Sequence, residues 1–294
     1  MDSSMTLANG PPKKVLSIDG GGIRGLSNLL ILEKIMEGIQ QEENLPGVPK
    51  PCDRFDLMGG TGTGGMNVDE SIKAYKKLSE TGFCQERTIS KRAVLAVTKN
   101  DVVTLPTIFT TYPPLTTILS QCSVWEIARA TSAAIAFFKP IKLGRDDIEF
   151  VDEVFGNNNP CETLIKEAEK LFPLNRIIAL SLGTGLGGVV QINDLQISIT
   201  SAFEKMASSS KATHHRLKDR YGGTKDYHRL DVISGLIDVT LLDSSALSKI
   251  AGLTESYLNE NGELVTDCVK ALATNGITRP LLRINVVIEL ILTW

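Results

Sequence analysis

A strand joined to a helix by a glycine-rich loop most constrains the fold of this chain. Residues 13–18 form a short run typical of a β-strand, and residues 26–39 carry apolar side chains at helical spacing. The loop between them reads Asp-Gly-Gly-Gly-Ile-Arg-Gly, from Asp19 to Gly25. Glycines at such a turn let the backbone bend sharply and approach a ligand closely. This segment therefore predicts a strand, a glycine loop and a helix in succession.

The remainder of the chain alternates between the same two kinds of element. We predict strands at 55–58, 93–97, 149–151 and 176–182, and helices at 69–78, 125–134, 162–170, 197–220 and 243–273. The stretch 104–117 is rich in Thr and Pro and predicts a loop. Alternating strands and helices are typical of an α/β fold with a largely parallel sheet covered by helices on both faces.

The composition favours one large globular domain. Of 294 residues, 42% are hydrophobic, which is enough for a sizeable core. The 31 basic and 34 acidic side chains are mixed along the sequence and give a formal net charge of −3. A nucleic-acid-binding domain usually has a clustered basic surface, so we expect no nucleic-acid partner.

The termini and the cysteines suggest where the protein acts. Residues 1–12 are polar and lack the apolar core of a signal peptide, and no apolar run is long enough to span a bilayer. The cysteines are odd in number and lack the paired spacing of a disulfide framework or a zinc site; they are Cys52, Cys84, Cys122, Cys161 and Cys268. We therefore expect free thiols, a cytoplasmic location and no transmembrane segment.

A second glycine-rich segment follows the predicted strand at 55–58. Its core, from Gly60 to Gly64, reads Gly-Thr-Gly-Thr-Gly and matches the G-x-S-x-G pattern of a nucleophile elbow except at the centre. Gly62 occupies the place of the nucleophilic serine, and glycine has no side chain that can attack a substrate. Thr61 and Thr63 carry hydroxyls, but we expect the tight turn to point them away from the position of Gly62.

Five blocks of the sequence together resemble the patatin-like phospholipases in order and spacing. They lie at 17–25, 60–65, 128–134, 151–160 and 181–185. The resemblance implies a three-layer α/β/α sandwich that uses a Ser–Asp dyad to cleave acyl esters of lipids. It also implies a flexible segment at 1–12, a patatin-like domain at 13–275 and a divergent tail at 276–294.

The resemblance assigns roles to individual residues. Asp152 is implied as the general base, and Gly62 marks the vacant nucleophile position between the elbow glycines Gly60 and Gly64. The backbone N–H groups of the loop would bind the developing oxyanion, with positive charge nearby; these residues are Gly20, Gly21, Gly22 and Arg24. The dyad needs no metal or cofactor. The implied partner is an acyl lipid or phospholipid, met through peripheral contact with a membrane.

Three departures from the family pattern accompany the resemblance. Gly62 removes the nucleophile, and only residues 66–68 separate the elbow from the predicted helix at 69–78, where the family has several turns of apolar helix. The family's Asp-Gly-Gly at the base is here Asp152-Glu153-Val154. We therefore expect hydrolysis to be impaired or absent.

Other interpretations of the sequence remain open. The chain hydrolyses esters weakly through a water molecule, or it is a lipid- or protein-binding pseudoenzyme, or it is a decayed product without a selected role. A further alternative comes from the loop alone, because residues 20–25 match G-x-G-x-x-G, the pattern of dinucleotide-binding loops.

Overall fold

The structure is a computed structural model of the chain. It describes residues 10–62, 91–98, 107–110, 112, 122, 124–133, 139–144, 147–152, 158–185, 197–233, 235–236, 239 and 244–273. The predicted helix at 69–78, together with Thr63, Gly64, Cys84 and Glu153-Val154, lies outside these residues.

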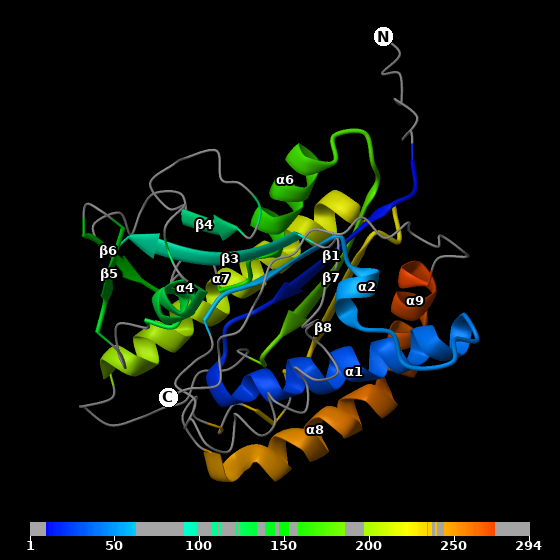
Figure 1. The fold of residues 1–294 in the computed structure, drawn as a ribbon. Coiled ribbons are helices and arrows are strands. Elements are labelled where there is room, and N and C mark those ends of the chain that lie inside the picture. The colour runs from blue at the N-terminus through cyan, green and yellow to red at the C-terminus, as the bar shows by residue number, and fades with distance from the viewer. Residues whose placement is uncertain are drawn as a thin grey trace.

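The described strands form one mixed sheet (Figure 1). They are β1 (Lys13–Ile18), β2 (Leu57–Gly60), β3 (Lys91–Thr98), β4 (Thr107–Thr110), β5 (Ile141–Leu143), β6 (Ile148–Val151), β7 (Ile177–Gly183) and β8 (Tyr227–Asp231). The sheet has the order β5-β6-β3-β2-β1-β7-β8, with β4 paired to β3. The run β3-β2-β1-β7-β8 is parallel, whereas β4 and β6 pair antiparallel with β3.

Helices cover both faces of the parallel part of the sheet. The longer ones are α1 (Gly25–Glu42), α4 (Val124–Thr131), α6 (Cys161–Leu171), α7 (Ile197–Tyr221), α8 (Leu247–Glu260) and α9 (Gly262–Leu272), and α2 (Pro51–Arg54) is a single turn. In Figure 1, α1, α8 and α9 lie on one side of the sheet, and α6 and α7 lie on the other. The predicted three-layer α/β/α sandwich is confirmed.

Strand β7 shows how the two faces are filled. Ile178 and Leu180 pack with residues of α1, α8 and α9, whereas Ile177 and Ala179 pack with residues of α6. Successive side chains of a strand point to opposite faces, so a strand buried on both sides must be apolar at nearly every position. All residues of β7 are buried, which explains why its sequence is a continuous run rather than an alternation.

The elements predicted from the sequence differ from the structure at several places. The stretch 104–117 contains strand β4, because its Thr-Ile-Phe-Thr segment is β-branched and aromatic and pairs with β3. The predicted helix at 243–273 is two helices, since α8 ends at Glu260 and α9 begins at Gly262, a poor residue for a helix interior. Strands β5 and β8 were not predicted at all.

The prediction of free thiols is wrong for Cys52. Cys52 is disulfide-bonded, whereas Cys122, Cys161 and Cys268 are free. An odd cysteine count without paired spacing does not exclude a single bridge. Disulfides are rare in reducing compartments, and the cysteines therefore no longer support a cytoplasmic location.

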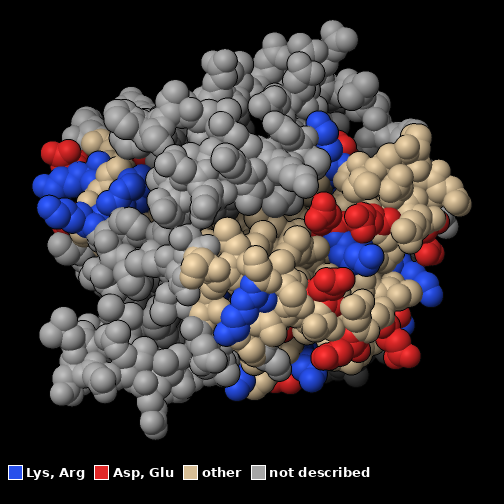
Figure 2. Space-filling view, turned by 90° about the horizontal axis from the view of Figure 1, so that it is seen from below, with Lys and Arg blue, Asp and Glu red and all other residues tan. Residues whose placement is uncertain are grey.

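In the view of Figure 2, the described acidic and basic side chains are interspersed on the right, whereas a group of basic side chains lies at the left edge. None of the helices described here is long and apolar enough to cross a membrane.

Replacing Leu180 by alanine should lower the free energy of unfolding by about 2–5 kcal/mol, because a buried side chain is lost and leaves a cavity. Leu180 is 0% exposed at the centre of β7. The control is Leu174→Ala, since Leu174 is 60% exposed and its loss should cost less than about 0.5 kcal/mol. Urea unfolding measures both, and equal losses would contradict the central position of β7.

Candidate functional site

The carboxyl ends of the parallel strands bring the predicted site segments together. Ile18, at the end of β1, is paired with Gly60 on one side and with Leu182 on the other. Asp231, at the end of β8, lies level with Gly183. The glycine loop after β1, the elbow after β2 and the turn after β7 therefore share one edge. In open α/β sheets, ligands bind at this edge.

The glycine loop is closely packed against the turn after β7. A Cβ atom on Gly21 would lie 2.3 Å from the side chain of Thr184, so only glycine fits there. The Thr184 hydroxyl donates to the carbonyl oxygen of Gly20 at 2.8 Å. Gly22 has a φ of +58°, which glycine adopts without strain. The loop therefore has one well-defined conformation.

The N–H group of Gly20 is engaged inside the protein. It donates to the hydroxyl of Thr61 at 3.1 Å and to the carbonyl oxygen of Asn158 at 3.3 Å. The same hydroxyl donates to the carbonyl oxygen of Asn158 at 2.9 Å. Thr61 is thus buried in contacts that tie the elbow to the glycine loop, in agreement with the expectation that it does not replace the nucleophile.

The described part of the predicted elbow ends at Gly62. Gly62 has a φ of +54°, in the left-handed region that side chains other than glycine rarely adopt. A Cβ atom on Gly60 would lie 2.9 Å from the carbonyl oxygen of Ile18, so the turn also requires glycine there. The N–H of Gly62 donates to the hydroxyl of Thr131, at the end of α4, at 3.1 Å.

Asp152 approaches the same end of α4. It follows β6, is buried, and its N–H donates to the carbonyl oxygen of Ala133 at 3.1 Å. Thr131 and Ala133 are two residues apart, so one short segment contacts both Gly62 and the implied base. The segment 131–133 is therefore hydrogen-bonded to both Gly62 and Asp152.

Arg24 is buried and bonded to the backbone. Its Nε donates to the carbonyl oxygen of Val239 at 2.8 Å, and its Nη1 donates to that of Gly185 at 3.3 Å. Burial lowers the pKa of Arg24 to about 10, which still leaves it charged at neutral pH. The guanidinium therefore connects the start of α1 to other loops, and its contribution to anion binding stays a prediction.

A buried ion cluster that the sequence analysis did not identify lies beneath the glycine loop. Arg229 of β8 donates to Asp19 at 2.7 and 3.2 Å, to Asp231 at 2.8 Å and to the hydroxyl of Ser181 at 2.8 Å. We name Asp19, Arg229 and Asp231 the carboxyl-edge cluster. In the sequence, Arg229 lies between His228 and Leu230, which are both buried. This alternation is the one sequence signal of a strand that carries Arg229.

Two members of the cluster, Asp19 and Arg229, have shifted pKa values. Burial raises the pKa of Asp19 to about 6; Arg229 opposes the rise, whereas the neighbouring charge of Asp231 adds to it. Burial also disfavours the charged form of Arg229, but the two carboxylates outweigh this and hold its pKa well above the usual value.

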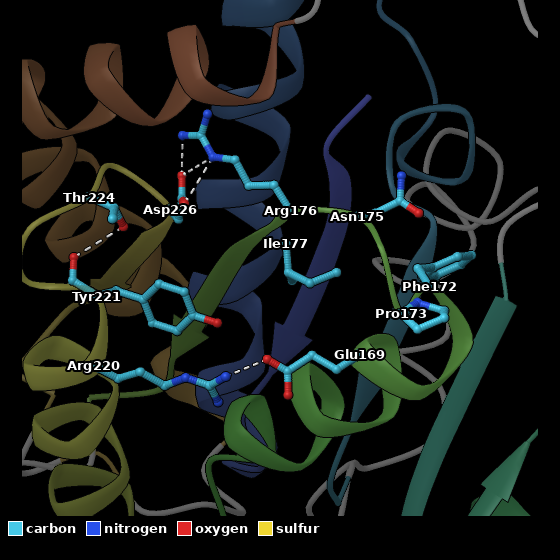
Figure 3. Close-up of a pocket in the computed structure, with 10 residues that line it drawn as sticks. All are labelled: Glu169, Phe172, Pro173, Asn175, Arg176, Ile177, Arg220, Tyr221, Thr224 and Asp226. Carbon is cyan, nitrogen blue, oxygen red and sulfur yellow. Dashed lines mark hydrogen bonds and ion pairs between the residues drawn. The ribbon is translucent and has the colours of Figure 1, made fainter. Parts of the chain in front are cut away.

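A hollow of about 520 Å³ lies at the opposite edge of the sheet (Figure 3). Arg176 and Ile177 of the β7 region line it with Asp226, which precedes β8. Its charged side chains form two pairs, Arg176 with Asp226 and Arg220 with Glu169. None of the predicted site residues lines it, so the hollow and the candidate site are separate features.

The fold and the site define an α/β protein with a glycine loop and an elbow turn at the carboxyl edge of its sheet. No protein-family model matches the chain. Short stretches are similar to patatins: 52% identity over 52 residues with "Probable inactive patatin-3-Kuras 1" of Solanum tuberosum, covering 18% of this chain and 14% of that protein. Patatin-2-Kuras 4 of Solanum tuberosum is 45% identical over 64 residues, 22% of this chain and 17% of the relative.

A third relative, Patatin-17 of Solanum cardiophyllum, is 52% identical over 52 residues, 18% of this chain and 13% of that protein. The matched stretches therefore span less than a fifth of each of these relatives. The resemblance to the patatin-like family that the sequence indicated is confirmed.

Replacing Asp19 by asparagine should change how stability depends on pH. Because the pKa of native Asp19 is about 6 instead of 3.8, the native state binds a proton between these values that the unfolded state does not. Raising the pH from about 4 to about 6 should therefore lower the free energy of unfolding of the unmodified protein by about 1–3 kcal/mol relative to the variant. Urea unfolding across this range measures the difference, and a pH-independent difference would refute the shifted pKa.

Proposed function

We propose that this chain is a patatin-like lipid acyl hydrolase domain in which Gly62 has removed the nucleophile, so that hydrolysis is impaired or absent. The observation that carries the proposal is the φ of +54° at Gly62, within a turn that contacts both the glycine loop and the segment beside Asp152. A left-handed backbone at this position fits an elbow that presents a nucleophile above a sheet. The nucleophile is missing at position 62, and the Asp-Gly-Gly pattern at the implied base is also altered.

The remaining groups fit acyl-ester chemistry in the following way. A serine at position 62 would attack the acyl carbonyl, and Asp152 would accept its proton. The N–H groups of Gly21 and Gly22 would stabilise the oxyanion, because Gly20 already donates to Thr61 and Asn158. With Gly62, no acyl-enzyme forms, and what remains is acyl-lipid binding or slow attack by water.

The glycine also changes the energetics of the turn. A side chain held at a left-handed φ costs about 1–3 kcal/mol, and glycine removes most of that cost. The elbow is therefore relaxed in this chain, and a serine placed there would be strained. That strain is the reason for a control variant that adds a Cβ atom without a hydroxyl.

The second candidate is a lipid-binding pseudoenzyme with no hydrolytic role. The absent nucleophile favours this candidate. The hydrogen bonds of the glycine loop, Thr61 and Gly62 do not need a side chain at position 62, so these contacts form without a catalytic group. A dinucleotide-binding loop is less well supported. Such a loop presents its N–H groups to phosphate, and the first of them here donates to Thr61.

Gly62→Ser should hydrolyse a short-chain chromogenic ester at least about 100-fold faster than the unmodified chain, because a missing catalytic serine costs several orders of magnitude. Gly62→Ala is the matched control, since it adds the same Cβ atom without a nucleophile, and it should stay inactive. Gly62→Ser/Asp152→Asn should lose the gained activity if Asp152 is the base. Circular dichroism and thermal unfolding establish that each variant is folded.

Binding of a short-chain phosphatidylcholine to the unmodified chain separates the two candidates. Saturable binding with no hydrolysis by folded Gly62→Ser would favour the pseudoenzyme. The absence of both binding and restored hydrolysis would refute acyl-lipid function. The proposed peripheral contact with a membrane would be measured by sedimentation with phosphatidylcholine vesicles.

A further inference from the structure

An arginine–aspartate pair lies towards each edge of the parallel sheet. At the amino edge, Arg176 donates from Nε to both oxygens of Asp226 at 2.8 and 2.9 Å, and its side chain is 54% exposed. At the carboxyl edge, the side chains of Arg229 and Asp19 are 6% and 1% exposed. The two pairs share their chemistry but differ in burial and in what they connect.

The carboxyl-edge cluster joins the two loops that border the candidate site. Asp19 begins the glycine loop, and its N–H donates to the carbonyl oxygen of Leu182 at 2.9 Å. Asp231 accepts a hydrogen bond from the N–H of Gly185 at 2.8 Å. Arg229 lies between the two carboxylates and donates to both. Through these two carboxylates, its guanidinium links the loop at 19–22 to the turn at 183–185, in addition to the direct hydrogen bond from Thr184 to Gly20.

Stability alone does not account for such a cluster. Two carboxylates and one guanidinium leave a buried negative charge, and removing charges from water costs several kcal/mol for each ion. Well-packed apolar residues of similar volume often stabilise a protein as much as a buried ion pair does. What ions provide here is directed hydrogen bonding, because a planar guanidinium can hold two carboxylates and a hydroxyl in one geometry.

We propose that Arg229 is a positioning residue for the candidate site. It holds Asp19 and Asp231 so that the N–H groups of the glycine loop face the oxygen of a bound acyl group. This inference rests on the proposed function, since it names what orients the groups that the function uses. Arg229 touches no reacting atom in it and acts only through Asp19 and Asp231.

The test uses Arg229→Met and Arg229→Lys, with Arg176→Met as the matched control at the other edge of the sheet. Each substitution is made in the unmodified chain and in the Gly62→Ser variant. Hydrogen–deuterium exchange follows the amides at 19–22 and 183–185 in the unmodified chain. Ester hydrolysis by the Gly62→Ser variants gives kcat and KM separately, at a temperature at which every variant is folded.

In the Gly62→Ser background, Arg229→Met should lower kcat about 10- to 100-fold with KM within about threefold, because misplaced oxyanion donors affect the transition state more than binding. Arg229→Lys keeps a charge but not the planar geometry and should lower kcat less. Exchange at 19–22 and 183–185 should rise in both variants. Arg176→Met should change neither kcat nor exchange at these amides.

Three results would overturn the inference. They are unchanged exchange at both loops in a folded Arg229 variant, a rise spread evenly over the whole chain, and an equal effect of Arg176→Met. If Arg229→Met does not fold, Arg229→Lys decides by the same criteria. If Gly62→Ser shows no hydrolysis, the catalytic part of the proposed function fails separately, and exchange in the unmodified chain still decides the role of Arg229.

Discussion

The central position of β1 is the constraint on which the rest of the structure depends. It is hydrogen-bonded to β2 on one side and to β7 on the other, both in parallel register. Because Leu16 and Val15 face opposite helix layers, a shift of one residue would move each into the wrong core. The register that satisfies both cores also places Asp19 beside the ends of β2 and β7. The geometry of the site is thus a consequence of how the sheet is buried.

The parts of the fold that the sequence predicted are those with a local signal. The glycine loop and the predicted elbow have distinctive residue patterns, and β7 is a continuous apolar run. Each can be recognised from the sequence without knowing which segments lie beside it in the fold. Strands β4, β5 and β8 were missed. Strand β4 lies in a Thr- and Pro-rich stretch, β5 has only three residues, and β8 contains Arg229 and Asp231 among its five residues. These segments are strands because they pair with β3, β6 and β7, and pairing is a property of the fold.

The site residues, too, could be predicted where they have a local sequence motif and were missed where they have none. Gly21 and Gly60 were identified from motifs, and the structure gives each a packing reason, against Thr184 and against Ile18. Arg229 had no motif, and its partner Asp19 lies 210 positions away in the sequence. Contacts between residues far apart in the sequence therefore account for what sequence reasoning did not find, including the group that we infer to orient the loop.

The charges around the glycine loop bear on which acyl ligand it accepts. Above the pKa of Asp19, the carboxyl-edge cluster carries a net negative charge beneath the loop and opposes a bound anion. The start of α1 and the buried Arg24 act in the opposite sense, since a helix amino terminus and a guanidinium both favour negative charge. An uncharged ester carbonyl avoids the repulsion and still accepts hydrogen bonds from the loop. For the function proposed above, Arg24 and the start of α1 would therefore have to outweigh the cluster wherever an oxyanion develops, whereas binding of an uncharged ester carbonyl would not require this.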